Sequence, residues 1–312
     1  MESNTQQVFQ PNMPEGSKPP VEDKQLIGER RSLLSIIIAK FFQNKLAVFG
    51  LVMLSIITTA CLLAPVIAPH DPAFQDLRNR LAPPSSDFWL GTDHLGRDLF
   101  SRMLYGGQVS LYVGFASMLG AVAIGSVIGA VAGYFGGLVD AFLMRLVDVI
   151  LAFPNIFLLI TLVAILQPSI NILILVFALL SWTGTARVVR GEFLTLKKRE
   201  FVLASRTIGM SNTRIIFSQI LPNALGPVIV AATLAVGGFI LAESALSFFG
   251  LGVQPPNASW GNMLTDSQSI TIFRNAWWYP TFPGLLILIT VLCFNFIGDG
   301  LRDALDPRVV EK

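Results

Sequence analysis

Few residues of this chain belong to the types that do chemistry, and those few do not cluster. Its two cysteines, Cys61 and Cys293, lie inside long apolar runs, whereas its two histidines, His70 and His94, lie outside them. Zinc sites and disulfide frameworks need several cysteine or histidine side chains at short spacing, so we expect neither. Two isolated histidines also do not support a hydrolytic triad. We therefore predict no catalytic, cofactor-binding or metal-binding residue.

Glu243 is the one carboxylate well inside an apolar run, and Ser244 and Ser247 lie on overlapping helical faces. An ionisable side chain in hydrocarbon is costly, so Glu243 is a candidate for lining or gating a pathway. It also lies close to one end of its run, where water or a hydrogen-bond donor would satisfy it. A proton relay would need more partners at membrane depth. Arg145 and Asp148, three residues apart near the end of another run, are expected to pair with each other instead.

These side chains are set in a chain with the composition of a membrane protein. Of its 312 residues, 53% are hydrophobic and 13% are charged, against roughly a quarter charged in soluble domains. Its 22 basic and 20 acidic residues give a net charge of +2. That balance excludes a protein that binds nucleic acid by neutralising phosphates. We expect membrane lipid, and no nucleic acid, around this chain.

Six apolar stretches are long enough to cross a bilayer. A helix needs about 20 mostly apolar residues to span the hydrocarbon core, and lipid offers no partner for an open backbone. We therefore predict an all-α membrane protein with six transmembrane helices. The stretches cover residues 46–68, 109–135, 149–166, 170–186, 224–250 and 279–298.

Basic residues set the expected orientation. Six spans place both termini on one side, and near the span ends that side carries 15 Lys and Arg residues against 5 on the other. Lysine and arginine concentrate in cytoplasmic loops. We therefore expect both termini in the cytoplasm of a multi-pass protein of the cell membrane.

The spans divide the rest of the chain into segments. Residues 1–45 are expected to form a cytoplasmic tail followed by an interfacial helix from about residue 32, or else an inner extension of the first span. The six-span domain then covers 46–308, and a short tail covers 309–312. Within the domain we expect outer loops at 69–106 and 251–278 and a cytoplasmic loop at 187–223.

A stripe of small residues marks one face of the second span. Ala121, Gly125, Gly129 and Gly133 recur every four residues, which lets another helix approach closely. The stripe predicts a packing interface, within this chain or between subunits, and does not identify a ligand.

Tryptophans gather in the second outer loop. The pair Trp277 and Trp278 is typical of the headgroup belt of a membrane. For Trp260 two interpretations stay open, a belt residue or part of a surface that faces a receptor. In the first outer loop, His94 is expected to be structural.

The cytoplasmic loop contains the strongest functional pattern. Residues 200–208 predict a short helix, which Gly209 ends by adopting positive φ. Ser211 or Asn212 then caps a second helix, and Pro222 is expected to stop it. Two such helices in a tight elbow, apolar on one side and basic on the other, form a compact knob suited to a partner's groove.

This loop resembles the EAA loop of bacterial ABC importer permeases. The resemblance covers the run from Glu200 through Ala204 and Ser205 to Gly209, with Pro222 thirteen residues further on. Leu203 and Ser205 stand where the common pattern has Glu and its second Ala.

Other stretches narrow the resemblance to the C-type subunit of dipeptide, oligopeptide and nickel permeases. Together they cover about residues 44–308 in order. They are Trp89 to Asp98, Leu143 to Pro154, Ala186 to Glu192, Ala242 to Gly252, Ser259 to Gly261 and Asn295 to Pro307.

The resemblance implies a type I, MetI-like permease fold and a non-catalytic role in an importer. The partners it implies are a second homologous permease in a heterodimer, two ATPase subunits that hold ATP and magnesium, and an extracytoplasmic substrate-binding protein. For docking to the ATPases it implies the residues Glu200, Ala204, Ser205, Arg206 and Gly209, with Pro222 at the loop's end.

The sequence agrees with that division of labour, because it contains no G-x-x-x-x-G-K-[ST] phosphate loop. Peptide is the substrate that the family implies, while nickel chelates, glutathione and opines remain alternatives. A secondary carrier that works without ATP is a more remote alternative, since we find no paired broken half-helices in inverted repeats.

Overall fold

The computed structural model describes residues 33–305, and every regular element in that range is helical. The predictions for residues 1–32 and 309–312 lie outside the described residues. Among the described residues, five helices are long and apolar enough to cross a membrane on their own or with a short continuation. They are α2 (Lys45–Leu62), α4 (Leu99–Phe135), α7 (Ile170–Leu196), α10 (Leu221–Phe248) and α12 (Trp278–Leu305).

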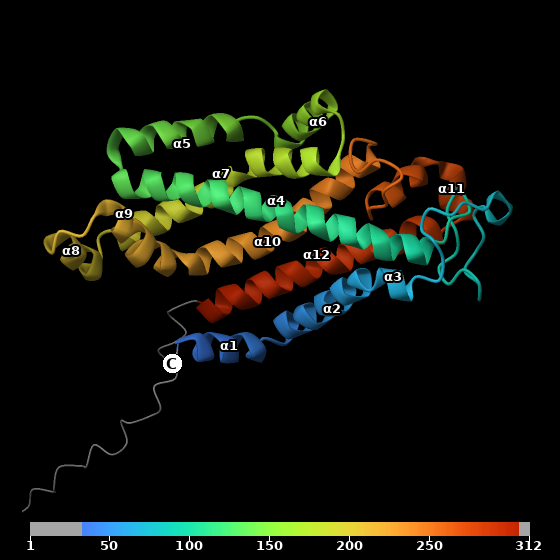
Figure 1. Ribbon diagram of the computed structural model, residues 1–312, viewed down its shortest axis with the longest axis horizontal. Coiled ribbons are helices and arrows are strands. Elements are labelled where there is room, and N and C mark those ends of the chain that lie inside the picture. Colours follow the sequence, from blue (N-terminus) through green and yellow to red (C-terminus); the bar gives the residue numbers. More distant parts are fainter. Residues whose placement is uncertain (1–32, 306–312) are drawn as a thin grey trace, which may run out of the picture.

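The stretch predicted as the third span, residues 149–166, contains the bend of a helix pair that begins at Gly137. Helix α5 (Gly137–Leu151) and helix α6 (Asn155–Leu166) meet at 84°. Pro154 causes the break, because proline has no N–H group and disfavours helical backbone at the residue before it. Residues 33–305 contain six spans only if this bent pair counts as one. Figure 1 shows that α5 lies alongside α4 and that α6 is turned away from the direction of α5.

The axes of the long helices are roughly parallel, whichever way the chain runs along them (Figure 1). The short elements gather at the two ends of the molecule. At one end lie α8 (Glu200–Thr207) and α9 (Asn212–Arg214), and the π-helical turn η2 (Ile215–Ile220) leads from them into α10. We call this the knob end; α1 and the C-terminal end of α12 also lie toward it. At the opposite, loop end lie α3 (Ala64–Ile67), η1 (Leu77–Asn79), η3 (Asn262–Gln268) and α11 (Ile270–Asn275).

Helix α1 (Leu33–Gln43) is a separate helix and not an unbroken extension of α2. Asn44 interrupts the helical backbone, and its side chain accepts hydrogen bonds from the N–H groups of Leu46 and Ala47. That is the geometry of an N-cap, which starts a new helix. Phe41 packs against the C-terminal part of α12, beside Ala304.

The small residues of α4 pack against α7, which confirms the predicted interface and places it within this chain. A Cβ atom at Gly129 would lie 2.5 Å from the carbonyl oxygen of Ala186, and one at Gly133 would lie 2.6 Å from Cβ of Phe193. Neither position has space for a larger side chain. Close backbone approach therefore holds α4 and α7 together over several turns.

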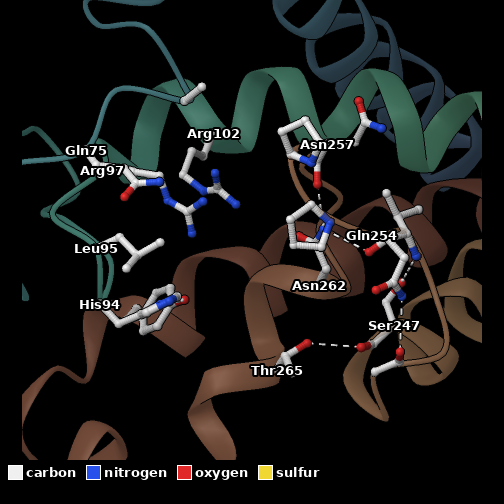
Figure 2. Close-up of a pocket in the computed structure, with 16 residues that line it drawn as sticks. Gln75, His94, Leu95, Arg97, Arg102, Ser247, Gln254, Asn257, Asn262 and Thr265 are labelled. Carbon is white, nitrogen blue, oxygen red and sulfur yellow. Dashed lines mark hydrogen bonds between the residues drawn. The ribbon is translucent and has the colours of Figure 1, made fainter.

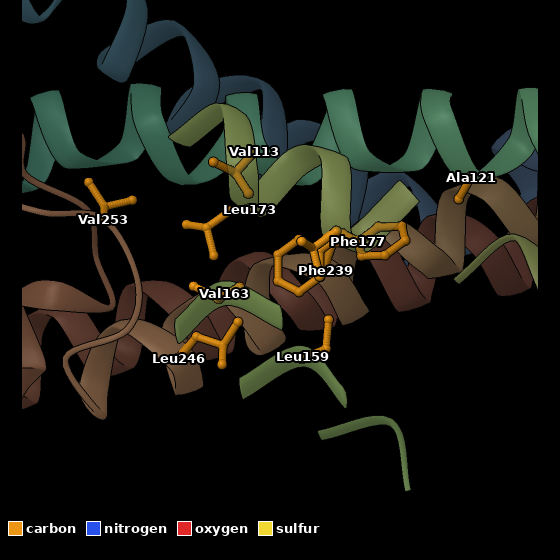
Figure 3. Close-up of a cluster of buried hydrophobic side chains, with 10 residues drawn as sticks. Val113, Ala121, Leu159, Val163, Leu173, Phe177, Phe239, Leu246 and Val253 are labelled. Atoms are coloured by element: carbon orange, nitrogen blue, oxygen red, sulfur yellow. The ribbon is translucent and has the colours of Figure 1, made fainter. Parts of the chain in front are cut away.

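A hydrophobic core joins α4, α6, α7 and α10 in the half of the molecule nearer the loop end. Phe177 of α7 and Phe239 of α10 meet with ring centroids 5.6 Å apart, and Val253 packs onto the same cluster from the segment after α10. Figure 3 shows these side chains converging from the four helices.

Candidate functional site

The elbow of the cytoplasmic loop forms as its sequence predicts. Helix α8 ends at Thr207, and Gly209 adopts φ +79°. The N–H of Gly209 donates to the carbonyl of Arg206 at 3.0 Å, and the N–H of Met210 donates to that of Ser205 at 3.1 Å. This pair of bonds is a Schellman motif, which satisfies the last carbonyls of a helix and favours glycine. We call residues 200–214 the knob.

Helix α8 exposes large apolar side chains among its charged ones. Phe201 is 39% exposed, Leu203 49% and Ile208, just after the helix, 78%. Val202 points the other way and is fully buried against a cluster that includes Ile215. Exposed apolar side chains on a short rigid helix are unusual unless a partner covers them.

The five residues expected to dock ATPases do not all lie on this surface. Glu200, Ala204, Arg206 and Gly209 are exposed, whereas Ser205 is buried. The hydroxyl of Ser205 donates to the carbonyl of Phe201 at 2.8 Å. The small side chain of Ser205 lets α8 pack closely on the protein beneath it, and its part in docking stays a prediction.

Pro222 does not stop the second helix of the loop. Helix α9 continues through η2 and α10, so residues 212–248 form one helical span. Pro222 stands in the first turn of α10, and just before it the N–H of Leu221 bonds to the carbonyl of Ile216, a π-type bond. A π turn changes the hydrogen-bond register, which accommodates a residue without an N–H group.

The knob shares a hydrophobic core with the ends of α4 and α7. The cluster contains Ala130, Tyr134, Val189, Phe193, Val202, Ile215, Ile216, Ile220, Ala224 and Val228. Sequence reasoning missed Tyr134 in this group. An aromatic residue at the end of a span is typical of the membrane interface, and that pattern does not show what the ring contacts.

At the loop end, Glu243 is fully buried and its carboxylate is held by serines from two helices. Ser110 of α4 donates to Oε2 at 3.2 Å, and Ser247 of α10 donates to Oε1 at 2.6 Å. The Ser110 hydroxyl accepts from the N–H of Trp260, and that of Ser247 accepts from the N–H of Val253, both at 3.1 Å. The network ties the second outer loop to α4 and α10, and the hydroxyls of Ser110 and Ser247 serve as hydrogen-bond donors to Glu243.

Trp260 does not face a receptor. Its ring is fully buried, and its Nε1 donates to the carbonyl of Met103 at 2.9 Å. The adjacent tryptophans Trp277 and Trp278 differ from each other. Trp277 is exposed, as a belt residue would be, whereas Trp278 is buried. Nδ1 of His94 lies 3.2 Å from the hydroxyl oxygen of Tyr279.

A cavity of about 500 Å³ lies among these outer segments. Figure 2 shows Arg97 and Arg102 on one side of it and Gln254, Asn262 and Thr265 on the other. Behind the arginines, Asp93 accepts from Nε of Arg97 at 2.6 Å and lies 3.4 Å from Nε of Arg102. Two arginines that share one fully buried carboxylate brace the first outer loop.

Two ion pairs hold α5 against α7, and they differ from the expected pairing of Arg145 with Asp148. Asp148 instead bonds to Nη2 of Arg187 at 2.7 Å. Asp140 accepts from Nε and Nη2 of Arg190 at 2.5 and 2.6 Å. For Asp148, Arg187 on the neighbouring helix takes the place expected of Arg145 on the same helix. The packing of α5 on α7 brings the planar guanidinium directly onto the carboxylate.

Metal-ligating side chains do not gather in the part of the chain that the structure describes. No three His, Cys, Asp or Glu residues among residues 33–305 come together as a possible site.

The model of the family described as binding-protein-dependent transport system inner membrane components matches residues 125–311. The chain belongs to this family. A second model, the N-terminal transmembrane domain of oligopeptide transport permease C, matches residues 32–84. Membership identifies a multi-pass inner membrane protein, in agreement with the apolar helices of the structure.

Individual relatives of this transport family match over most of their length. The dipeptide transport system permease protein DppC of Alkalihalophilus pseudofirmus is 42% identical over 95% of this chain and 96% of its own. DppC of Bacillus subtilis is 43% identical over 86% of this chain and 83% of its own. The oligopeptide transport system permease protein OppC of the same organism is 40% identical over 86% and 88%.

The fold of this chain is also similar to that of a solved transporter structure. A chain of the MetNI methionine ABC transporter in an inward-facing conformation superposes with a TM-score of 0.50 and 19% identity, over 64% of this chain and 95% of that chain. The likeness confirms the predicted all-α, MetI-type permease fold.

Proposed function

We propose that this chain is the permease subunit of an ATP-driven importer of short peptides. With a second homologous permease it forms the pathway into the cytoplasm. Two ATPase subunits bind ATP and magnesium and supply the energy, and an extracytoplasmic binding protein delivers the peptide. The chain itself catalyses no reaction. The observation that carries the proposal is the group of exposed apolar side chains on the knob in a member of a binding-protein-dependent transport family.

The knob's geometry supports ATPase docking. The knob exposes Phe201 and Leu203 of α8 and Ile208 just after it, with the charged side chains of Glu200 and Arg206 beside them. A short helix with an apolar face and flanking charges fits a groove on another protein. The Schellman elbow and the buried Val202 hold that helix at a defined angle, so force applied to it reaches the long helices.

Peptide as substrate is supported by the relatives' names, which specify dipeptide and oligopeptide transport. The cytoplasmic location of the knob end is supported by the basic residues near it and by α1 and the end of α12, which lie toward the same end. This orientation places the knob where ATP is available.

Reconstituted uptake tests the proposal. The complete transporter in proteoliposomes, with its binding protein, is expected to accumulate a radiolabelled dipeptide or tripeptide only when ATP is present. Omission of the ATPase subunits should abolish uptake. Accumulation by the permeases alone would indicate a secondary carrier, and ATP-dependent uptake of a nickel chelate, glutathione or an opine without peptide uptake would refute the substrate.

A charge reversal tests the docking surface. Glu200→Lys is expected to release the ATPase subunits from the purified complex, because it places a like charge among Lys197, Lys198 and Arg206 and alters the exposed first turn of α8. Co-purification of the ATPases with the tagged permease measures the effect. Asp299→Lys, at an exposed position of α12, is the matched control and should retain them. Full retention by Glu200→Lys would contradict the docking role.

A further inference from the structure

Tyr134 occupies the last full turn of α4, where that helix meets both helices of the knob. Its side chain is 6% exposed and packs in the cluster that joins α4, α7 and the knob. A tyrosine of the membrane headgroup belt would keep its hydroxyl in water. The hydroxyl of Tyr134 is instead bonded to another residue of the chain.

Both polar contacts of Tyr134 reach the knob. Its hydroxyl donates to Oδ1 of Asn212, the first residue of α9, at 2.7 Å. The guanidinium carbon of Arg206, in α8, lies 5.2 Å from the centroid of its ring. The distance is that of a cation–π contact. One side chain of α4 therefore contacts the two helices on either side of the elbow.

The backbone next to Tyr134 is also held. Nζ of Lys197, in the link between α7 and α8, donates to the carbonyl of Gly133 at 2.7 Å. A cation at the C-terminal end of a helix interacts favourably with the helix dipole. The end of α4 thus has contacts with the link before the knob, with α8 and with α9.

Helix α4 leads from this point to the loop end without interruption. It runs from Leu99 to Phe135, and at its other end Ser110 takes part in the Glu243 network. Its glycines hold it against α7 over several turns. A displacement of its last turn is therefore carried along a stiff element to the segments that surround the outer cavity (Figure 1).

We propose that Tyr134 is a positioning residue that joins the ATPase-driven movement of the knob to α4. The inference rests on the proposed function and adds to it the side chain through which the motion passes. Arg206 accordingly acts within this chain, by stacking on Tyr134, in addition to lying on the docking surface. Removal of the joint should leave docking and ATP hydrolysis intact while peptide uptake falls.

The test measures ATP hydrolysed per peptide transported, in proteoliposomes that hold the complete transporter. Tyr134→Leu should raise this ratio about tenfold, the factor that corresponds to loss of one hydrogen bond and one cation–π contact. Tyr134→Phe keeps the ring and the core packing and removes the hydrogen bond alone, so it should raise the ratio by a smaller factor. Phe135→Leu, at the exposed neighbouring position, is the control and should match the wild type.

A double variant separates a joint from simple packing. Asn212→Ala should reproduce the effect of Tyr134→Phe, and the combination should be no worse than either alone, because both remove the same hydrogen bond. Additive effects would overturn the inference. If Tyr134→Leu fails to assemble, the comparison of Tyr134→Phe with Asn212→Ala still tests whether the hydrogen bond between these two residues couples the knob to α4.

The outcomes distinguish this inference from the proposed function. Loss of ATP-dependent peptide uptake in the wild type would refute the proposed function itself. A wild type that transports, with Tyr134→Leu and Tyr134→Phe at the wild-type ratio of ATP to peptide, would refute only the role of Tyr134.

Discussion

The two ends of this permease differ in how their polar side chains are held. At the loop end, polar side chains are buried and bonded to one another, as in the network of Glu243, Ser110 and Ser247. At the knob end, apolar side chains such as Leu203 and Ile208 are exposed, and a few directional contacts attach the knob to the long helices.

The difference indicates which contacts are complete within this chain. A fully bonded buried network makes a structure rigid and specific, since any rearrangement leaves a polar group unpaired. An exposed apolar helix gains stability only when another molecule covers it. The Glu243 network is therefore determined within this chain, whereas the exposed apolar side chains of the knob suit the partner proposed for it.

The largest effect is expected from breaking the network of the loop end. Glu243→Ala leaves the hydroxyls of Ser110 and Ser247 without their acceptor in the interior, at a cost of about 3 kcal/mol in the free energy of unfolding. Denaturant titration of the purified permease in detergent, followed by tryptophan fluorescence, measures the loss. Glu200→Ala on the exposed knob is the matched control and should change stability by less than about 0.5 kcal/mol. Equal stability of both variants would erase the contrast between the ends.

An intermediate effect is expected at the elbow of the knob. Gly209 has φ +79°, and its Cβ position is open, so the cost of Gly209→Val is that of the backbone alone. A left-handed conformation costs a residue with a side chain about 1–2 kcal/mol. The permease should stay folded while the strained elbow uncouples ATP hydrolysis from uptake in proteoliposomes.

Gly191→Val is the control for the elbow. Gly191 also has open space at its Cβ position, but it lies in ordinary helical backbone of α7. Valine is compatible with that backbone, so coupling should remain normal. Normal uptake by a stably inserted Gly209→Val variant would show that the angle of the elbow is unimportant.

The smallest effects are expected from the ion pairs between α5 and α7. The side chains of Asp148 and Arg187 are each 52% exposed, so Asp148→Asn should cost less than about 0.5 kcal/mol. Asp140 is 16% exposed and makes two bonds to Arg190, so Asp140→Asn should cost about 1 kcal/mol. The same denaturant titration ranks the two variants, and the reverse order would show that exposure does not govern these pairs.

Features encoded by neighbouring residues could be predicted well. Hydrophobic runs located the membrane helices, the four-residue spacing of Gly125, Gly129 and Gly133 located the α4–α7 interface, and Gly209 located the elbow. Each depends on local periodicity or on a backbone preference of one residue.

Predictions failed where two local rules competed or where a distant partner decided. Proline breaks helices, yet Pro154 separates α5 from α6 while Pro222 follows a π turn that accommodates it. Trp260 has the residue type of a headgroup belt, but Met103 supplies a buried acceptor for its ring nitrogen. Neither the π turn nor the acceptor is visible in the adjoining sequence.

The amino-acid sequence alone determined the membrane class, the approximate spans, the transport family and the turn at Gly209, because hydrophobicity and backbone preference act over a few residues. Tertiary structure alone decided that Glu243 is a buried acceptor, that Ser205 faces inward and that Tyr134 connects α4 to the knob. The contacts of Glu243 with Ser110 and of Tyr134 with Asn212 join residues 133 and 78 positions apart. Only the packing of the helices brings such residues within hydrogen-bond distance.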